Sequence, residues 1–222
     1  MEVYNLARLF NHKIKKFFIC ILIAVLLFIS IKLVVKIIYP INYENYIKKY
    51  SQHYNIDSHL VAAIINVESK YDTFAVSKKD ARGLMQISPT TGNWASEKID
   101  IQDFTLESLY DPEINIRIGC WYLSVLTDEF NGNLQLILAA YNGGSGNVNK
   151  WLKDDRYSED GKSLDYIPFK ETSDYVEKVL KNYEMYKKIY KNTFDMESSY
   201  RYNFKKNIKS TFIKMFENYI DV

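Results

Sequence analysis

The stretch NIDSHLVAAIINVE, residues 55–68, decides the fold of this 222-residue chain. Asp57 and Ser58 are residue types that cap the N-terminus of a helix. The residues after them alternate between apolar and small or polar types with the three- and four-residue spacing of a helix. The apolar positions are Leu60, Val61, Ile64 and Ile65. The pattern predicts an amphipathic helix whose apolar face ends at Glu68.

Glu68 continues the apolar stripe, since Ile64 and Val61 precede it by four and seven residues. Burial disfavours the ionised carboxylate and raises its pKa. The C-terminal end of a helix also opposes a negative charge. Both effects favour a protonated carboxyl near neutral pH, which is the state that a general acid needs. Periodicity leaves a second interpretation open, a surface glutamate paired with Lys70 or Arg82.

Further helices are predicted on both sides of this segment. Ser88-Pro89 and Asp111-Pro112 each open one, with proline where a missing N–H costs nothing. The expected helical ranges are 88–94, 111–125, 134–141 (ended by Gly143, Gly144 and Gly146), 172 or 173–190, and a pattern from about residue 46. The chain has only 8 Gly and 4 Pro. We therefore expect an all-α domain over 44–190.

The charge of the chain is unevenly distributed. Residues 1–40 carry six basic residues and one acidic residue, a net charge of +5, whereas residues 41–222 carry 23 basic and 26 acidic residues. A nucleic-acid-binding domain concentrates Lys and Arg on its folded part. The sequence therefore predicts no nucleic-acid partner.

Residues 17–31, FFICILIAVLLFISI, carry no charge. A helix over 17–38 would rise about 33 Å, enough to cross a bilayer core. We predict a transmembrane anchor at 17–38 behind a basic cytoplasmic stub at 1–16. A cleaved signal peptide is the alternative, but no small-x-small cleavage site follows the run. Lysines flank both ends, so charge alone leaves the orientation open.

Three minor features complete the organisation of the chain. The only cysteines are Cys20, inside the apolar run, and Cys120, in the folded part, so the sequence predicts no disulfide framework. No Cys/His spacing is typical of a metal site. Residues 191–222 form an amphipathic tail that packs on the domain or touches the membrane surface. Trp94, Trp121 and Trp151 are core residues or sugar-stacking surfaces, and most of the aromatic residues should be core.

Several short segments carry a more specific signal when they are taken in order. They are Val67-Glu68-Ser69-Lys70-Tyr71, Ala75-Val76-Ser77, Gly83-Leu84-Met85-Gln86-Ile87, Ala140-Tyr141-Asn142-Gly143-Gly144 and Glu171-Thr172-x-x-Tyr175-Val176. Each one alone is compatible with an ordinary turn or helix cap. Together they resemble the catalytic domain of the soluble lytic transglycosylase (SLT) family, which is related to goose-type lysozyme, over about residues 46–190.

The resemblance implies a lysozyme-like helical fold that binds peptidoglycan glycan strands, with no cofactor and no metal. It implies that Glu68 is the single catalytic acid/base and that Tyr175 places its hydroxyl near that carboxylate. The implied substrate-binding positions are Ser77, Gln86, Ser88, Ala140, Tyr141 and Asn142. Two positions depart from the family pattern: Asp80 stands where many relatives have Gly, and Ser88 where many have Met.

No second carboxylate lies in a matched motif with a catalytic role; Asp72, Asp111, Glu113 and Glu171 are interpreted as caps and surface charges. The resemblance implies non-hydrolytic cleavage between MurNAc and GlcNAc that leaves 1,6-anhydroMurNAc ends. A lysozyme-like hydrolase and a non-catalytic peptidoglycan-binding scaffold remain as alternatives. The expected location is the cell membrane, single-pass, with the catalytic domain on the extracytoplasmic side. Partners in a cell-envelope complex are not identified by any residue.

Overall fold

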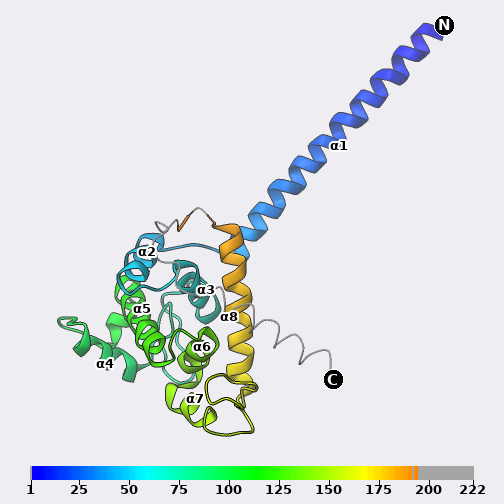
Figure 1. The fold of residues 1–222 in the computed structure, drawn as a ribbon. Coiled ribbons are helices and arrows are strands. Elements are labelled where there is room, and N and C mark those ends of the chain that lie inside the picture. Colours follow the sequence, from blue (N-terminus) through cyan, green and yellow to red (C-terminus); the bar gives the residue numbers. More distant parts are fainter. Residues whose placement is uncertain (1, 192, 195–222) are drawn as a thin grey trace. The chain divides into compact units, whose positions relative to one another are not determined.

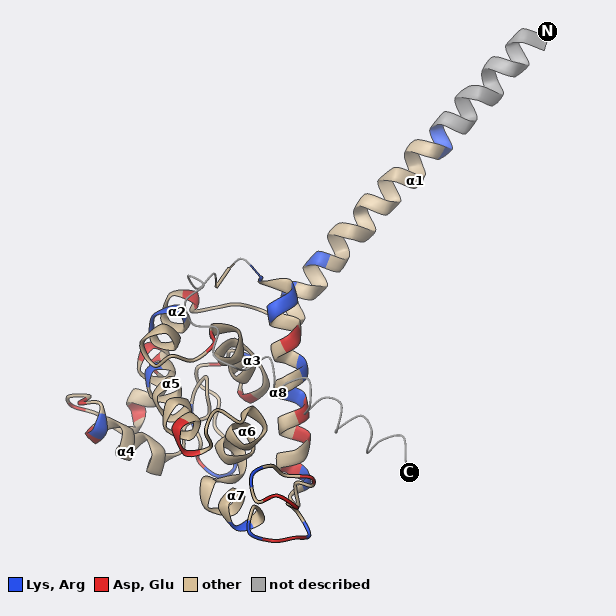
Figure 2. Cartoon of the chain, viewed as in Figure 1, with Lys and Arg blue, Asp and Glu red and all other residues tan. Residues whose placement is uncertain are grey.

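A computed structural model describes residues 2–191, 193 and 194, and the chain divides after Ile41 into two compact units. The first unit contains the single helix α1, Glu2–Ile38 (Figure 1). Its part from Lys15 to Ile38 is long and apolar enough to cross a membrane. Figure 2 shows basic residues toward the two ends of this stretch and none along its middle. The helix has no break at residue 16 or 17, where the sequence predicted the stub to end.

The second unit is helical throughout, and within the described residues it has isolated β-bridges but no strand. Its helices are α2 (Glu44–His53), α3 (Ser58–Glu68), α4 (Pro89–Lys98), the 3₁₀ helix η1 (Leu106–Tyr110), α5 (Pro112–Glu129), α6 (Leu134–Gly143), α7 (Ser145–Trp151) and α8 (Lys170–Ile189). The predicted all-α class is confirmed.

The predicted helix starts carry the expected caps. The Asp57 carboxylate accepts a hydrogen bond from the His59 N–H at 2.8 Å and opens α3. The Ser88 hydroxyl accepts from the Thr91 N–H at 3.1 Å, and the Asp111 carboxylate accepts from the Ile114 N–H at 2.9 Å. Side-chain capping of this kind pairs backbone donors that the first helical turn leaves without partners.

Some predicted boundaries were wrong. Helix α4 runs to Lys98 instead of ending at Trp94. Helix α8 begins at Lys170, which is two or three residues before the predicted start at 172 or 173. Helix α6 includes Gly143 and ends at Gly144, whose φ of 87° an L side chain would resist. Gly146 does not end α6 but lies inside α7, a helix that the sequence did not predict because glycines are unfavourable in helices.

Helix α3 lies at the centre of the second unit, where it packs most extensively against α8 (Figure 1). Its residues Leu60 to Ile65 are buried. The Asn66 side chain also donates to that of Asn182 on α8 at 2.8 Å. These contacts fix the C-terminal end of α3, and with it Glu68, beside α8.

The tail expected at 191–222 lies mostly outside the described residues. Phe194, the last residue that the structure describes, is buried and packs edge-on against the His59 ring at 5.1 Å. Cys20 and Cys120 are both free thiols, and the second is buried.

A single side chain from α5 holds the loop between α3 and α4. The buried Asn115 accepts from the Met85 N–H at 2.8 Å and donates to the carbonyls of Arg82 and Leu109 at 2.9 and 2.7 Å. Gly83 is necessary for this approach, because a Cβ there would lie 2.2 Å from the Leu109 carbonyl oxygen. The sequence analysis did not identify Asn115.

We predict that Asn115→Ala lowers the free energy of unfolding by about 3 kcal/mol, because it removes the side-chain partner of the Met85 N–H and of the Leu109 carbonyl, whereas the Arg82 carbonyl still accepts from the Ile87 N–H. Chemical denaturation would measure this. The matched control is Asn149→Ala, which removes an exposed amide bonded to Glu129 and should change stability by less than about 0.5 kcal/mol. Equal effects of the two variants would contradict a structural role specific to Asn115.

Candidate active site

Glu68 is the last residue of α3 and is only partly accessible to solvent. The next residue, Ser69, donates its hydroxyl to the Leu84 carbonyl at 2.8 Å and so joins the end of α3 to the loop over 75–87. Residues from four parts of the chain gather around this point: the end of α3, that loop, the end of α6 and the start of α8.

Burial raises the pKa of the Glu68 carboxyl to about 7. The Tyr175 hydroxyl opposes this shift, and the negative charge of Glu171 adds to it. The carboxyl is therefore divided between its two protonation states near neutral pH. A group in this condition can give a proton and take one back.

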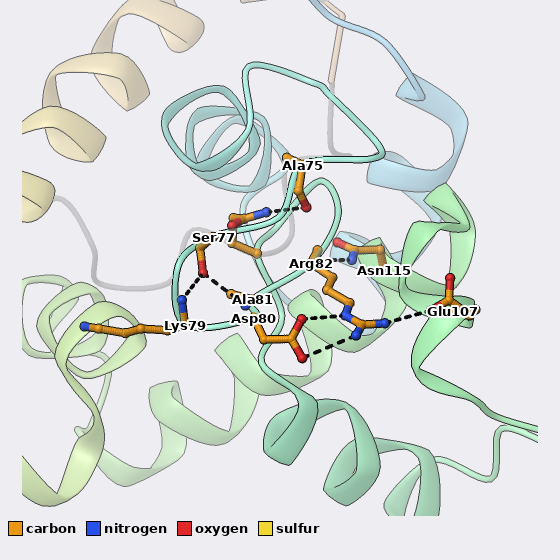
Figure 3. A network of polar contacts seen from close by, with 9 residues as sticks. Ala75, Ser77, Lys79, Asp80, Ala81, Arg82, Glu107 and Asn115 are labelled. Atoms are coloured by element: carbon orange, nitrogen blue, oxygen red, sulfur yellow. Dashed lines mark hydrogen bonds and ion pairs between the residues drawn. The ribbon is translucent and has the colours of Figure 1, made fainter.

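The alternative interpretation of Glu68 as a surface ion-pair partner was wrong for Arg82. That guanidinium lies 3.0 Å from a carboxylate oxygen of Asp80 and 3.0 Å from one of Glu107 (Figure 3). No ion pair found among residues 2–191, 193 and 194 includes Glu68. The same contacts give Asp80, one of the two departures from the family pattern, a structural role.

Two tyrosines lie around the carboxyl, Tyr175 buried and Tyr141 partly buried. The Tyr175 hydroxyl interacts with Glu68, and it forms no full hydrogen bond with any described residue. The Tyr141 hydroxyl donates to the Met85 carbonyl at 2.8 Å. Burial and the charge of Glu68 raise the pKa of both phenols, so both remain protonated. Tyr175 is therefore a permanent donor facing an exchangeable carboxyl.

The loop over 75–87 carries two of the predicted binding residues. Gln86 has a φ of 50°, and its side-chain amide donates to the carbonyls of Ala75 and Gly83 at 3.1 and 2.9 Å. The exposed Ser77 accepts from the N–H groups of Lys79 and Ala81 through its hydroxyl oxygen (Figure 3). Both side chains stabilise the loop, and their contact with a sugar stays a prediction.

The remaining predicted binding residues also form hydrogen bonds within the protein. Ser88 caps α4 and also donates its hydroxyl to that of Thr91 at 2.9 Å. Asn142 accepts from the Thr172 hydroxyl at 2.9 Å, which joins the end of α6 to the start of α8. Ala140 has its side chain in the core, and its carbonyl accepts from the Gly144 N–H at 2.8 Å.

Glu171 acts on the site through its charge, which the sequence did not predict. It was interpreted as a cap or surface charge, and its side chain is indeed 77% exposed, 4.0 Å from the Lys79 ammonium. Its charge nevertheless raises the pKa of Glu68. The signal in the sequence was the four-residue spacing to Tyr175, which puts both residues on one face of α8.

Within the described residues, no group of three or more His, Cys, Asp or Glu side chains is arranged to hold a metal ion.

Comparison with solved structures gives the class of protein first. The fold matches the lytic transglycosylase Slt of Pseudomonas aeruginosa, solved as an inactive glutamate-to-glutamine mutant, with a TM-score of 0.62 and 34% identity over 69% of this chain and 25% of that one. It also matches the 70-kDa soluble lytic transglycosylase in complex with bulgecin A, with a TM-score of 0.62 and 29% identity over 73% of this chain and 27% of that one.

Sequence comparison then gives the family. The family model "Transglycosylase SLT domain" matches residues 45–164, and the chain belongs to this family. It is 35% identical to the soluble lytic murein transglycosylase of Escherichia coli over 62% of this chain and 22% of that protein. It is 32% identical to the membrane-bound lytic murein transglycosylase C of Edwardsiella ictaluri over 51% of this chain and 34% of that protein. The chain thus spans only about a fifth to a third of these relatives.

We predict that Glu68→Gln stabilises the folded protein, and more so as pH rises. The parent carboxyl binds its proton more tightly when folded than when unfolded, so the parent loses stability as pH rises from about 4.5 to about 7. The neutral amide has no such loss. Above pH 7 the variant should therefore exceed the parent by up to about 3 kcal/mol.

Denaturation across the pH range measures this difference, and Glu113→Gln is the matched control. Lys49 and Tyr50 lower the pKa of the Glu113 carboxyl, so its ionised form stabilises the fold and its removal should act with the opposite sign. A pH-independent effect of Glu68→Gln would show that the carboxyl is not shifted by burial.

We predict that Glu171→Gln lowers the pKa of Glu68, because it removes a negative charge that disfavours ionisation. Carboxyl-carbon NMR of protein labelled at glutamate would follow the Glu68 titration directly. Glu177→Gln on the same helix, which removes a carboxylate paired with Lys181, should leave it in place. An unchanged Glu68 titration in Glu171→Gln would contradict the electrostatic coupling.

Proposed function

We propose that this protein is a membrane-anchored peptidoglycan lytic transglycosylase that cleaves the β-1,4 bond between MurNAc and GlcNAc without consuming water. The observation that carries the proposal is the Glu68 carboxyl, whose pKa burial raises to about 7 beside the Tyr175 hydroxyl, in a domain of the SLT family. The relatives named as lytic murein transglycosylases, and the inactive glutamate mutant of one of them, support the same assignment.

In the proposed first step, protonated Glu68 gives its proton to the glycosidic oxygen as the bond to C1 of MurNAc breaks. The Tyr175 hydroxyl stabilises the carboxylate that forms, since it lowers the pKa of that group. The leaving GlcNAc unit departs with a neutral hydroxyl. General acid catalysis of this kind contributes about 10²- to 10⁴-fold to a rate.

The positive charge that develops at C1 needs a nucleophile, and a second protein carboxylate is the usual source. Glu171, the other carboxylate that influences Glu68, is exposed beside Lys79 and has no position in the buried site. We therefore assign the stabilising role to the N-acetyl oxygen of the substrate. Glu68, now a base, takes the proton of the C6 hydroxyl, whose oxygen closes the 1,6-anhydro ring on C1.

The proposal also assigns roles to the parts of the chain. Residues 17–38 are the membrane anchor, 1–16 the cytoplasmic stub, 44–190 the catalytic domain and 191–222 an accessory tail. Because peptidoglycan lies outside the cytoplasmic membrane, the catalytic domain faces the extracytoplasmic side. The apolar part of α1 and the membrane-bound relative support the anchor.

We predict that Glu68→Gln lowers the turnover of purified cell-wall sacculi by at least about 10²-fold while the fold is retained. Mass spectrometry of the fragments released by the parent should find 1,6-anhydro ends. Asn149→Ala, which removes an exposed amide that lies outside the matched segments and bonds to Glu129, is the activity control.

Each other outcome contradicts a different part of the proposal. Reducing ends in place of anhydro ends would identify a hydrolase. Sacculus binding by the parent with no released fragment would identify a binding scaffold. Equal turnover by the parent and Glu68→Gln would remove Glu68 from the mechanism.

A further inference from the structure

Four aromatic rings lie in sequence from the candidate site to the surface of α4, and we call them the aromatic row: Tyr141, Tyr122, Trp94 and Trp121. The ring centroids of Tyr141 and Tyr122 are 5.6 Å apart, those of Tyr122 and Trp94 6.3 Å, and those of Trp94 and Trp121 4.7 Å. Tyr141 begins the row at the site, because the charge of Glu68 acts on its phenol.

Trp94 is the most exposed ring of the row and is not a core residue, since 40% of its surface is exposed. Helix α4 buries a different face, which contains Gly92 and Ala95. That face is tightly packed: a Cβ on Gly92 would lie 3.1 Å from the Phe104 ring. The buried face of α4 therefore leaves part of the Trp94 ring open to solvent, where a ligand can pack on it.

The neighbours of Trp94 fix its ring. Trp121 and Tyr122, both on α5 and both partly buried, meet it edge-on at interplanar angles of 67° and 80°. Such T-shaped contacts are the favoured arrangement of aromatic pairs. An exposed ring that is already held in one orientation loses little side-chain entropy when a ligand packs on it.

The row also limits how far Trp94 can lie from the site. The two centroid separations place the Trp94 ring no more than about 12 Å from the Tyr141 ring, which is the span of a disaccharide and not of a long oligosaccharide. Helix α4 itself begins at Pro89, directly after its cap Ser88 and three residues after Gln86, so its N-terminal end is anchored beside the site loop.

We propose that Trp94, supported by Trp121 and Tyr122, is a stacking platform for a sugar ring of the glycan strand, within about the length of a disaccharide from Tyr141 at the site. A pyranose ring presents an apolar face of C–H groups, and an aromatic ring packs on it without needing a charged partner. The inference rests on the proposed function and adds to it a binding position that makes the protein prefer long strands to short fragments.

The test measures binding of two peptide-free glycan fragments, of one and of two disaccharide units, by calorimetry. The full chain in detergent micelles carries Glu68→Gln throughout, so that the fragments are not consumed. We expect this protein to bind the longer fragment more tightly, and Trp94→Ala to reduce the ratio of the two affinities about tenfold. Trp94→Phe, which keeps an aromatic face, should restore most of the ratio.

Tyr166→Ala is the matched control, because it removes an exposed aromatic ring that is not in the row. It should leave the ratio unchanged. An unchanged ratio in Trp94→Ala would overturn the platform, as would a change in self-association in place of glycan affinity, measured by sedimentation. If neither fragment binds and the active chain releases nothing from sacculi, the proposed function fails as well, so the two failures are distinguishable.

Discussion

The rest of the second unit is arranged around the partial burial of the Glu68 carboxyl where α3 meets α8. A carboxyl at that position is costly to ionise, and the end of a helix adds to the cost. The surrounding structure neither neutralises the group with a cation nor leaves it fully in water. It supplies one phenol, Tyr175, which lowers the pKa, and one carboxylate, Glu171, which raises it. The balance of these effects gives a proton that can leave and return near neutral pH.

The polar contacts around Glu68 serve mainly to hold backbone in place. Asn115 pairs with three backbone groups of the loop and η1, and Tyr141 and Ser69 each donate to a loop carbonyl. Several positions expected to bind sugar are thus already engaged with the protein itself. Such engagement is compatible with binding, since a group that is held in place before the ligand arrives loses less entropy when it binds. The site is accordingly better described as a rigid frame around one exchangeable proton.

The aromatic row extends that frame away from the proton. An enzyme that acts on a polymer gains from contacts remote from the reacting bond, because binding energy at a distance helps to position the reacting groups. Trp94 meets this need, because α4 packs through the face with Gly92 and Ala95 and leaves part of the Trp94 ring exposed to a ligand.

The sequence alone determined the helical class, the capped helix starts, the apolar helix at the N-terminus and the importance of Glu68, because caps, periodicity and hydropathy are properties of neighbouring residues. It left open whether Glu68 is buried or paired at the surface. Only the tertiary structure decided this, since the answer depends on Arg82 pairing with Asp80 and Glu107 and on α8 covering the end of α3. The contacts of Asn115, Glu171 and Trp94 were likewise decided by the packing of segments distant in sequence, which local patterns do not record.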